Sequence, residues 1–135
     1  MQQRIILRKL DKPVLKNPEG DIFWLCDSFG FTSGRDIEDI TSRTIYTFLR
    51  RYSEERAASS DELAEEMHVS PSRINYHVRG LIESGFLYRN KRLILLRAGS
   101  LKAAVEELRK DANRIFDELS IVAEEIDSAL GLKSR

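Results

Sequence analysis

The stretch SSDELAEEMHVSPSRINYHVRGLIESGFLYRNKRLILLR, residues Ser59 to Arg97, decides the fold of this chain. Ser59 and Glu62 form a Ser-x-x-Glu capping box, which marks the start of a helix. Ser70 followed by Pro71 marks a second helix start a few residues later. Two helices separated by a tight turn predict a helix-turn-helix.

The second of these helices, expected from Pro71 to Ser84, has an outward face that lacks acids before Glu83. Its apolar residues fall on the other side at helical spacing. Arginine pairs with guanine, asparagine with adenine, and hydroxyls with phosphate oxygens. We therefore predict that this face contacts DNA and is not a plain solvated surface. The predicted contact residues are Ser70, Ser72, Arg73, Asn75, Tyr76 and Arg79.

A β-hairpin is expected after Gly85, which suits a left-handed cap at the end of the helix. Strand-forming residues, Phe86 to Tyr88 and Leu93 to Leu96, flank a polar tip. The charge of the tip is exposed and free of competing acids, which suits contact with phosphates or the minor groove. The tip consists of Arg89, Asn90, Lys91 and Arg92.

The segment NYHVRGLIESGFLYRNKR, residues 75–92, resembles the HL..L...GLV signature of ArsR-type winged-helix transcription regulators. The helix and turn DELAEEMHVSPS precede it, as in that family. The signature is shared loosely by MarR-like, PadR-like and other winged-helix groups. The resemblance implies a dimeric DNA-binding regulator whose third helix enters the major groove. The matching residues are His77, Val78, Leu81, Gly85, Phe86 and Leu87.

The chain departs from the metal-sensing branch of that family, whose cysteine pair has no counterpart near Glu66 to Ser70. Its one cysteine, Cys26, and its two histidines, His68 and His77, show no recognisable ligand spacing. We expect no metal and no cofactor. A structural role at the junction of helix and wing is expected for His77.

Composition indicates one compact unit with an appendage. The chain has 135 residues, with 41% hydrophobic and 33% charged residues. Its 22 basic and 22 acidic residues give a formal net charge of zero, so the basic balance typical of many nucleic-acid-binding domains is absent. Positive charge is instead concentrated between Pro71 and Arg97. No apolar run could span a bilayer and no signal peptide is apparent, so we expect a cytoplasmic protein without membrane contact.

The first 35 residues are expected to form an N-terminal extension. Arg4 to Leu10 predicts a short strand, and Pro13 to Gly20 predicts turns in a connector. Asp21 to Phe31, DIFWLCDSFGF, is rich in aromatic residues and is expected to cover the main domain or a partner subunit. The alternative is an effector pocket in which Cys26 acts as a thiol sensor.

A helix expected over Asp36 to Glu55 completes the DNA-binding domain, residues 36–98. Residues 99–131 then predict one long helix, about 45 Å at 1.5 Å per residue, which exceeds the width of a small domain. Its apolar residues form a heptad seam, which favours a coiled-coil-like dimer over packing on its own domain. The predicted dimerisation residues are Leu101, Val105, Leu108, Ala112, Ile115, Leu119, Val122 and Ile126.

These patterns predict a mainly α fold with a small β-wing (α+β), a winged helix-turn-helix with a long C-terminal dimerisation helix. The predicted function is a homodimeric, sequence-specific transcription regulator that binds double-stranded DNA, with an inverted repeat as the expected site. The alternative is a winged-helix protein-interaction module in a transcription or chromosome assembly. We do not expect an enzyme, because the sequence has neither a glycine-rich phosphate loop nor a nucleophile with a histidine partner.

Overall fold

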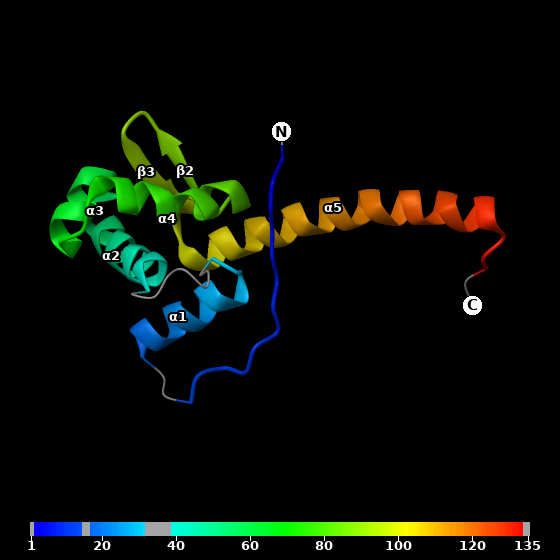
Figure 1. The fold of residues 1–135 in the computed structure, drawn as a ribbon, viewed down its shortest axis with the longest axis horizontal. Helices are drawn as coiled ribbons and strands as arrows, with labels where there is room; N and C mark the ends of the chain where they lie inside the picture. Colours follow the sequence, from blue (N-terminus) through cyan, green and yellow to red (C-terminus); the bar gives the residue numbers. More distant parts are fainter. Residues whose placement is uncertain (1, 15–16, 32–38, 134–135) are drawn as a thin grey trace.

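The computed structural model describes residues 2–14, 17–31 and 39–133. It is mainly helical, with one small antiparallel sheet and a long C-terminal helix (Figure 1), which confirms the predicted winged-helix fold class. The elements are α1 (Pro18–Ser28), α2 (Ile40–Glu55), β1 (Ala58–Ser59), α3 (Ser60–Met67), α4 (Pro71–Ser84), β2 (Leu87–Asn90), β3 (Leu93–Leu96), a 3-10 turn η1 (Arg97–Gly99) and α5 (Leu101–Leu130).

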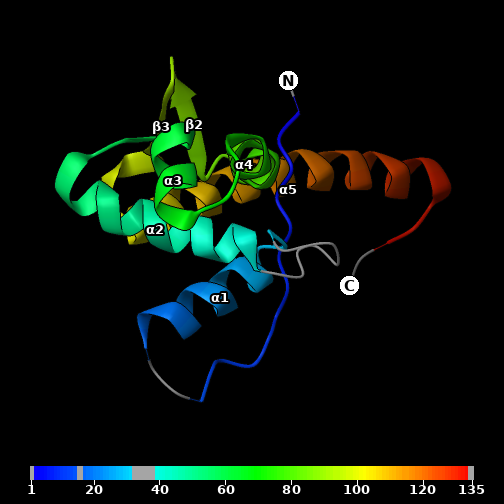
Figure 2. The ribbon, with the colours of Figure 1, turned by 60° about the vertical axis from the view of Figure 1, so that its left-hand side comes forward.

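One hydrophobic core holds these elements together. Helix α2 packs against α1, α3 and α4, and Figure 2 shows it lying between α1 and the α3–α4 pair. Phe48 of α2 and Ile94 of β3 are fully buried in the same cluster as Phe86, which follows α4. The core therefore fixes how α4 and the sheet sit relative to each other.

The local signals at the ends of α3 and α4 are confirmed. Ser59 Oγ accepts a 3.1 Å hydrogen bond from the Glu62 amide, and Glu62 Oε1 accepts one of 3.0 Å from the Ser59 amide. Helix α4 begins at Pro71 after the Ser70 cap and ends at Gly85. Helix α2 begins at Ile40, and its predicted start, residues 36–38, lies outside the described residues.

The strand predicted over Arg4 to Leu10 is wrong, because the structure has no regular secondary structure there. The segment is tied instead to helix ends. The Arg4 amide donates to the Glu83 carbonyl at 3.1 Å, and the Arg8 amide to the Ser28 carbonyl at 2.7 Å. The last turn of a helix leaves its carbonyls without intrahelical partners, so these ends can bind an extended segment that has no strand edge beside it.

The connector predicted over Pro13 to Gly20 is wrong at its end, where α1 begins. Asn17 Oδ1 accepts a 2.7 Å hydrogen bond from the Gly20 amide, and Pro18 occupies the first helical position. Asparagine and proline are turn formers, but they are also common at the N-cap and first position of a helix. The Asn17–Pro18 pair was therefore consistent with either a turn or the start of a helix.

The aromatic segment covers the main domain, as predicted. Phe29 and Phe31 stack at 5.4 Å between ring centroids, and both contact Phe86, at 6.5 and 5.7 Å. Cys26 is fully buried in the core cluster. A thiol sensor must be accessible to its oxidant, and this position is not.

Helix α5 places its apolar stripe in two surroundings. Leu108 is 2% exposed in the core of its own chain, and Leu101 and Val105 pack against that core. The C-terminal part of the helix extends away from the rest of the molecule (Figures 1 and 2). The prediction of Leu108 as a dimer contact is therefore wrong. The exposed seam residues are Ile115, Leu119, Val122 and Ile126, at 37%, 58%, 51% and 50%.

A buried carboxylate joins the N-terminal segment, the end of the sheet and α5. Asp111 is 3% exposed. It accepts a 2.7 Å hydrogen bond from Gln3 Nε2 and one of 3.1 Å from Arg97 Nη2, and it also pairs with Arg114. Asp111 follows Leu108 on the buried side of α5. Its partner Arg97 is the last basic residue of the segment from Pro71 to Arg97, and its charge is paired with Asp111 inside the fold.

The surroundings of Asp111 favour its charged form. The hydrogen bond from Arg97 lowers the pKa of Asp111 from 3.8 to about 2, with further lowering by Gln3 and by the charges of Arg97 and Arg114, although burial alone would raise it. A carboxyl whose pKa is lower in the folded chain stabilises the fold above its unfolded pKa. That stabilisation is lost as the pH falls through the folded pKa.

We expect Asp111→Asn to lower the free energy of unfolding by about 2 kcal/mol at pH 7, which is the energy of the pKa difference. The wild-type chain should lose this contribution between about pH 4 and pH 2, and the variant should not. Urea unfolding followed by circular dichroism measures both. As a control, Asp117→Asn removes the same charge from an exposed position on α5 and should cost less than about 0.5 kcal/mol. Equal effects of the two substitutions would contradict the assignment.

Candidate nucleic-acid interface

Helix α4 presents the face that the sequence predicts. Ile74, Val78 and Leu81 are fully buried against the core. Ser70 caps the helix by accepting a 3.2 Å hydrogen bond from the Arg73 amide. The predicted contact residues on the opposite side are all exposed: Ser70, Ser72, Arg73, Asn75, Tyr76 and Arg79.

The hairpin has a shorter tip than predicted. Asn90 pairs with Leu93, so Lys91 and Arg92 alone form the turn, and Lys91 adopts a left-handed conformation with φ 61°. Arg89 and Asn90 therefore belong to strand β2 rather than to the tip. The longer tip was predicted because four polar residues separate two apolar runs, and Lys91 and Arg92 are not the glycine or asparagine usual in a two-residue hairpin turn. All four side chains are exposed.

A third strand joins the hairpin to the helix-turn-helix. Ala58 pairs with Ile94 and Ser59 with Leu93, which makes the sheet order β1-β3-β2. Strand β1 was missed because two residues cannot display an alternating pattern. Since Ser59 is also the N-cap of α3, the wing is attached directly to the start of that helix.

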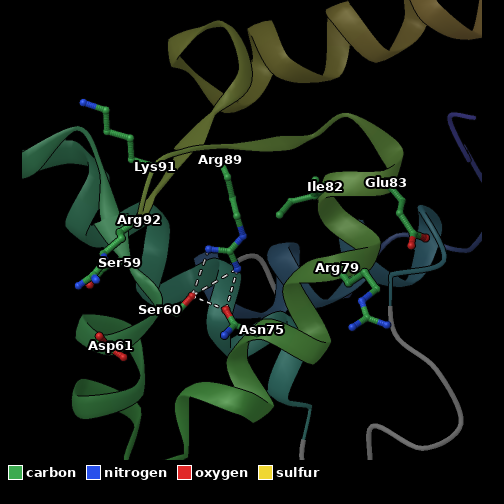
Figure 3. Close-up of a pocket in the computed structure, with 10 residues that line it drawn as sticks. All are labelled: Ser59, Ser60, Asp61, Asn75, Arg79, Ile82, Glu83, Arg89, Lys91 and Arg92. Carbon is green, nitrogen blue, oxygen red and sulfur yellow. Dashed lines mark hydrogen bonds between the residues drawn. The ribbon is translucent and has the colours of Figure 1, made fainter. Parts of the chain in front are cut away.

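A groove of about 570 Å³ lies between α4 and the wing (Figure 3). Its lining includes four cationic residues, one from α4 and three from the hairpin, and two acids. In Figure 3 the Arg89 side chain points from β2 across the groove towards α4. The excess of cations suits an anionic backbone. The charged lining residues are Arg79, Arg89, Lys91, Arg92, Asp61 and Glu83.

Three of the side chains that line this groove are hydrogen-bonded to one another. Asn75 Oδ1 accepts hydrogen bonds from Ser60 Oγ at 2.5 Å and from Arg89 Nη2 at 2.7 Å. Arg89 Nη1 and Nη2 also lie 3.5 and 3.4 Å from Ser60 Oγ. Two predicted contact residues, Asn75 and Arg89, are thus brought together. Ser60 was missed, because nothing in the sequence pairs a residue at the start of α3 with one on β2.

Two acids of α3, Glu62 and Glu66, form ion pairs with arginines of α2. Arg51 Nη2 lies 2.6 Å from Glu62 Oε2, and Arg51 Nη1 lies 3.1 Å from Glu66 Oε1. Arg50 also pairs with Glu66. The pKa of Glu62 is lowered, chiefly by the hydrogen bond from the Ser59 amide. Glu62 and Glu66 are therefore balanced by α2, whereas Asp61, at the start of α3, lines the groove beside the cations of α4 and the wing.

An exposed helix, a cationic wing and a groove between them lie within one continuous segment. The model of the MarR family matches residues 42–93. The match covers less than half of the chain and supports a winged-helix domain of the kind found in DNA-binding transcription regulators. It does not confirm the resemblance to ArsR-type regulators, which stays a prediction. A search of curated proteins and a search of solved structures gave no significant match.

The MarR-matching region, residues 42–93, contains every predicted DNA-contact residue. Helix α1, the N-terminal segment and α5 lie outside it. Among the described residues, no helix is both long and apolar enough to cross a membrane. The MarR match therefore covers the candidate interface. It does not cover α5, whose role has to be inferred from its structure.

A second groove, of about 360 Å³, lies on the other flank of α4. The N-terminal segment forms one wall through Arg4 and Ile6, and α4 contributes Tyr76, Arg79 and Gly80. Arg4 is exposed there. The exposed face of α4 is thus a ridge between two grooves, each of which has arginine in its lining.

The two histidines have structural positions in the fold. His77 Nδ1 and Thr41 Oγ1 share a 3.0 Å hydrogen bond between α4 and α2. His77 therefore lies in the middle of α4 and not at the predicted junction with the wing. His68 ends α3 in a left-handed conformation. Within the ranges that the structure describes, no three His, Cys, Asp or Glu side chains are grouped to hold a metal ion.

Two glycines in this region have opposite constraints. Gly85 has φ 90°, and a Cβ there would lie 2.7 Å from Gln3 Nε2, whereas a Cβ on Gly80 would meet nothing within 4 Å. We expect Gly85→Ala to destabilise the fold by about 1–2 kcal/mol or more. Gly80→Ala should stabilise it by up to about 1 kcal/mol, because alanine has the higher helix propensity. Thermal unfolding measures both, and a shift of the same sign for the two would contradict this account.

Proposed function

We propose that the chain is a homodimeric, sequence-specific transcription regulator that binds double-stranded DNA, with α4 in the major groove and the wing on the backbone or minor groove. The observation that carries the proposal is the acid-poor exposed face of α4 beside a cationic groove, on a fold whose central segment matches the MarR family. An exposed helix with that composition matches the donor and acceptor pattern of the major groove.

The charged residues divide into two roles by position. Arg73 and Arg79 stand on the exposed face of α4, where they can reach base edges or nearby phosphates. Lys91 and Arg92 form the two-residue turn of the wing, where long cationic side chains suit phosphates. The charges of α4 therefore contribute to specificity, and those of the turn contribute mainly to affinity.

The dimer proposal rests on the distal half of α5. Its seam residues Leu119, Val122 and Ile126 are 58%, 51% and 50% exposed. Exposed apolar stripes at heptad spacing are buried by pairing with a second helix. A two-fold pair would hold two α4 helices for half-sites about 34 Å apart, one turn of DNA, and so read an inverted repeat.

For DNA binding, we expect Arg73→Ala with Arg79→Ala to weaken duplex binding by roughly 100-fold, and to reduce the slope of log affinity against log salt by up to about 2. Electrophoretic shift of a selected duplex at several salt concentrations measures both quantities. Arg109→Ala with Lys110→Ala is the control, since it removes the same charge from the exposed side of α5. It should leave both quantities nearly unchanged.

If the arginine variant binds as the wild type does, the contact assignment is wrong. If the wild type shows no salt-sensitive binding to any duplex at low ionic strength, the proposal fails. The winged helix would then be a protein-interaction module.

For the dimer, we expect Leu119→Glu with Val122→Glu to convert the protein to monomers, because two carboxylates would have to be buried in the paired face. Sedimentation equilibrium at micromolar concentration measures the mass. Ile121→Glu is the matched control: it is 59% exposed but lies on the opposite side of the helix, two residues from Leu119. It should remain a dimer. A wild-type protein that sediments as a monomer would contradict the homodimer.

A further inference from the structure

Asn75 stands on the exposed face of α4, but one end of its side chain is already in use. Its Oδ1 accepts from Ser60 Oγ and from Arg89 Nη2, at 2.5 and 2.7 Å. Arg89 also contacts Ser60, so the three side chains form a closed ring that connects α3, α4 and β2 (Figure 3). We call this ring the Ser60–Asn75–Arg89 triangle.

The chemistry of the partners fixes which end of the amide faces the wing. A guanidinium group has donors and no acceptor, so the atom that faces Arg89 has to be the amide oxygen. Ser60 accepts from Arg89 and therefore donates its own proton to Asn75. Both lone pairs of Oδ1 are occupied, and the Nδ2 group, with two N–H donors, has no hydrogen-bond partner within the part of the chain that the structure describes.

This orientation changes what Asn75 can read. Bidentate recognition of adenine needs both ends of the amide, the oxygen for N6–H and the nitrogen for N7. A group that offers donors alone matches guanine, whose O6 and N7 are both acceptors, and thymine through O4, whereas adenine offers only N7, next to an amino group that disfavours a second donor. Adenine and cytosine present an amino group where guanine and thymine present a keto oxygen.

We infer that the wing, through Arg89, holds Asn75 as a donor-only reader that favours a keto base, guanine or thymine, over adenine. The inference rests on the proposed function, because it requires α4 in the major groove. It replaces the pairing of asparagine with adenine that the sequence alone suggests. To read adenine, Asn75 would have to give up a charge-assisted hydrogen bond and leave the buried Ser60 hydroxyl without its acceptor.

Selection of bound duplexes from a random pool tests the inference in two steps. The first step compares the wild type with Asn75→Ala. The position whose base preference disappears in the variant is the one that Asn75 reads. We expect guanine or thymine there in the wild-type selection, with adenine disfavoured roughly ten-fold or more. Adenine at that position, or no position affected by the substitution, would overturn the inference.

The second step removes the two donors that hydrogen-bond to the amide oxygen of Asn75. Arg89→Met keeps a long side chain but has no donor, and adding Ser60→Ala removes the other one. We expect the double variant to bind adenine at this position to within a few-fold of guanine or thymine. Arg89→Met alone changes an exposed residue and should shift the base preference in the same direction. It replaces the double variant in the test if the double variant does not fold.

Arg92→Met is the matched control, since it removes one positive charge from the wing at a position that does not contact Asn75. It should weaken binding to every sequence and leave the preference unchanged. If adenine stays as strongly disfavoured after Arg89→Met, or if Arg92→Met changes the preference equally, the triangle does not set specificity. Binding to no duplex at all would overturn the proposed function as well, whereas specific binding with an unaltered profile would overturn this inference alone.

Discussion

The arrangement of this molecule depends on one buried carboxylate. Asp111 lies where the N-terminal segment, the end of the sheet and α5 meet, and each of them supplies a hydrogen-bond donor to it through Gln3, Arg97 and Arg114. Burying a charge is costly unless it is paired and hydrogen-bonded, so the three donors have to stay in place together. The distal part of α5 is thereby held in a fixed direction relative to the wing.

Sequence reasoning succeeded where the signal is local and failed where the partner is distant. The caps at Ser59 and Ser70 and the left-handed Gly85 are set by chemistry within a few residues, and all three were predictable. Asp111 lies outside the heptad seam of α5, where acids on a long helix are usually solvated. Its burial depends on Gln3, which is 108 residues away, and no spacing rule connects the two.

The same difference between local signals and distant partners holds for the candidate interface. Which residues of α4 face outward follows from helical periodicity. How the Asn75 side chain is oriented does not follow from periodicity, because Ser60 and Arg89 come from other elements and meet Asn75 only in the fold. Sequence reasoning therefore gives which side chains are exposed on α4, but not which of their hydrogen-bonding atoms are already paired within the fold. The identity of a base-reading residue is thus less informative than which of its atoms remain unpaired.

The formal net charge is zero, but the charges are sorted along the molecule. From Pro71 to Arg92 there are five bases and one acid, and from Ala112 to Leu130 five acids and one base. The two segments lie towards opposite ends of the long axis (Figure 1), so the chain is an electric dipole. Near a polyanion, such a molecule experiences a torque that turns its basic end forward. At 0.1 M salt this orienting field is largely screened beyond about 10 Å.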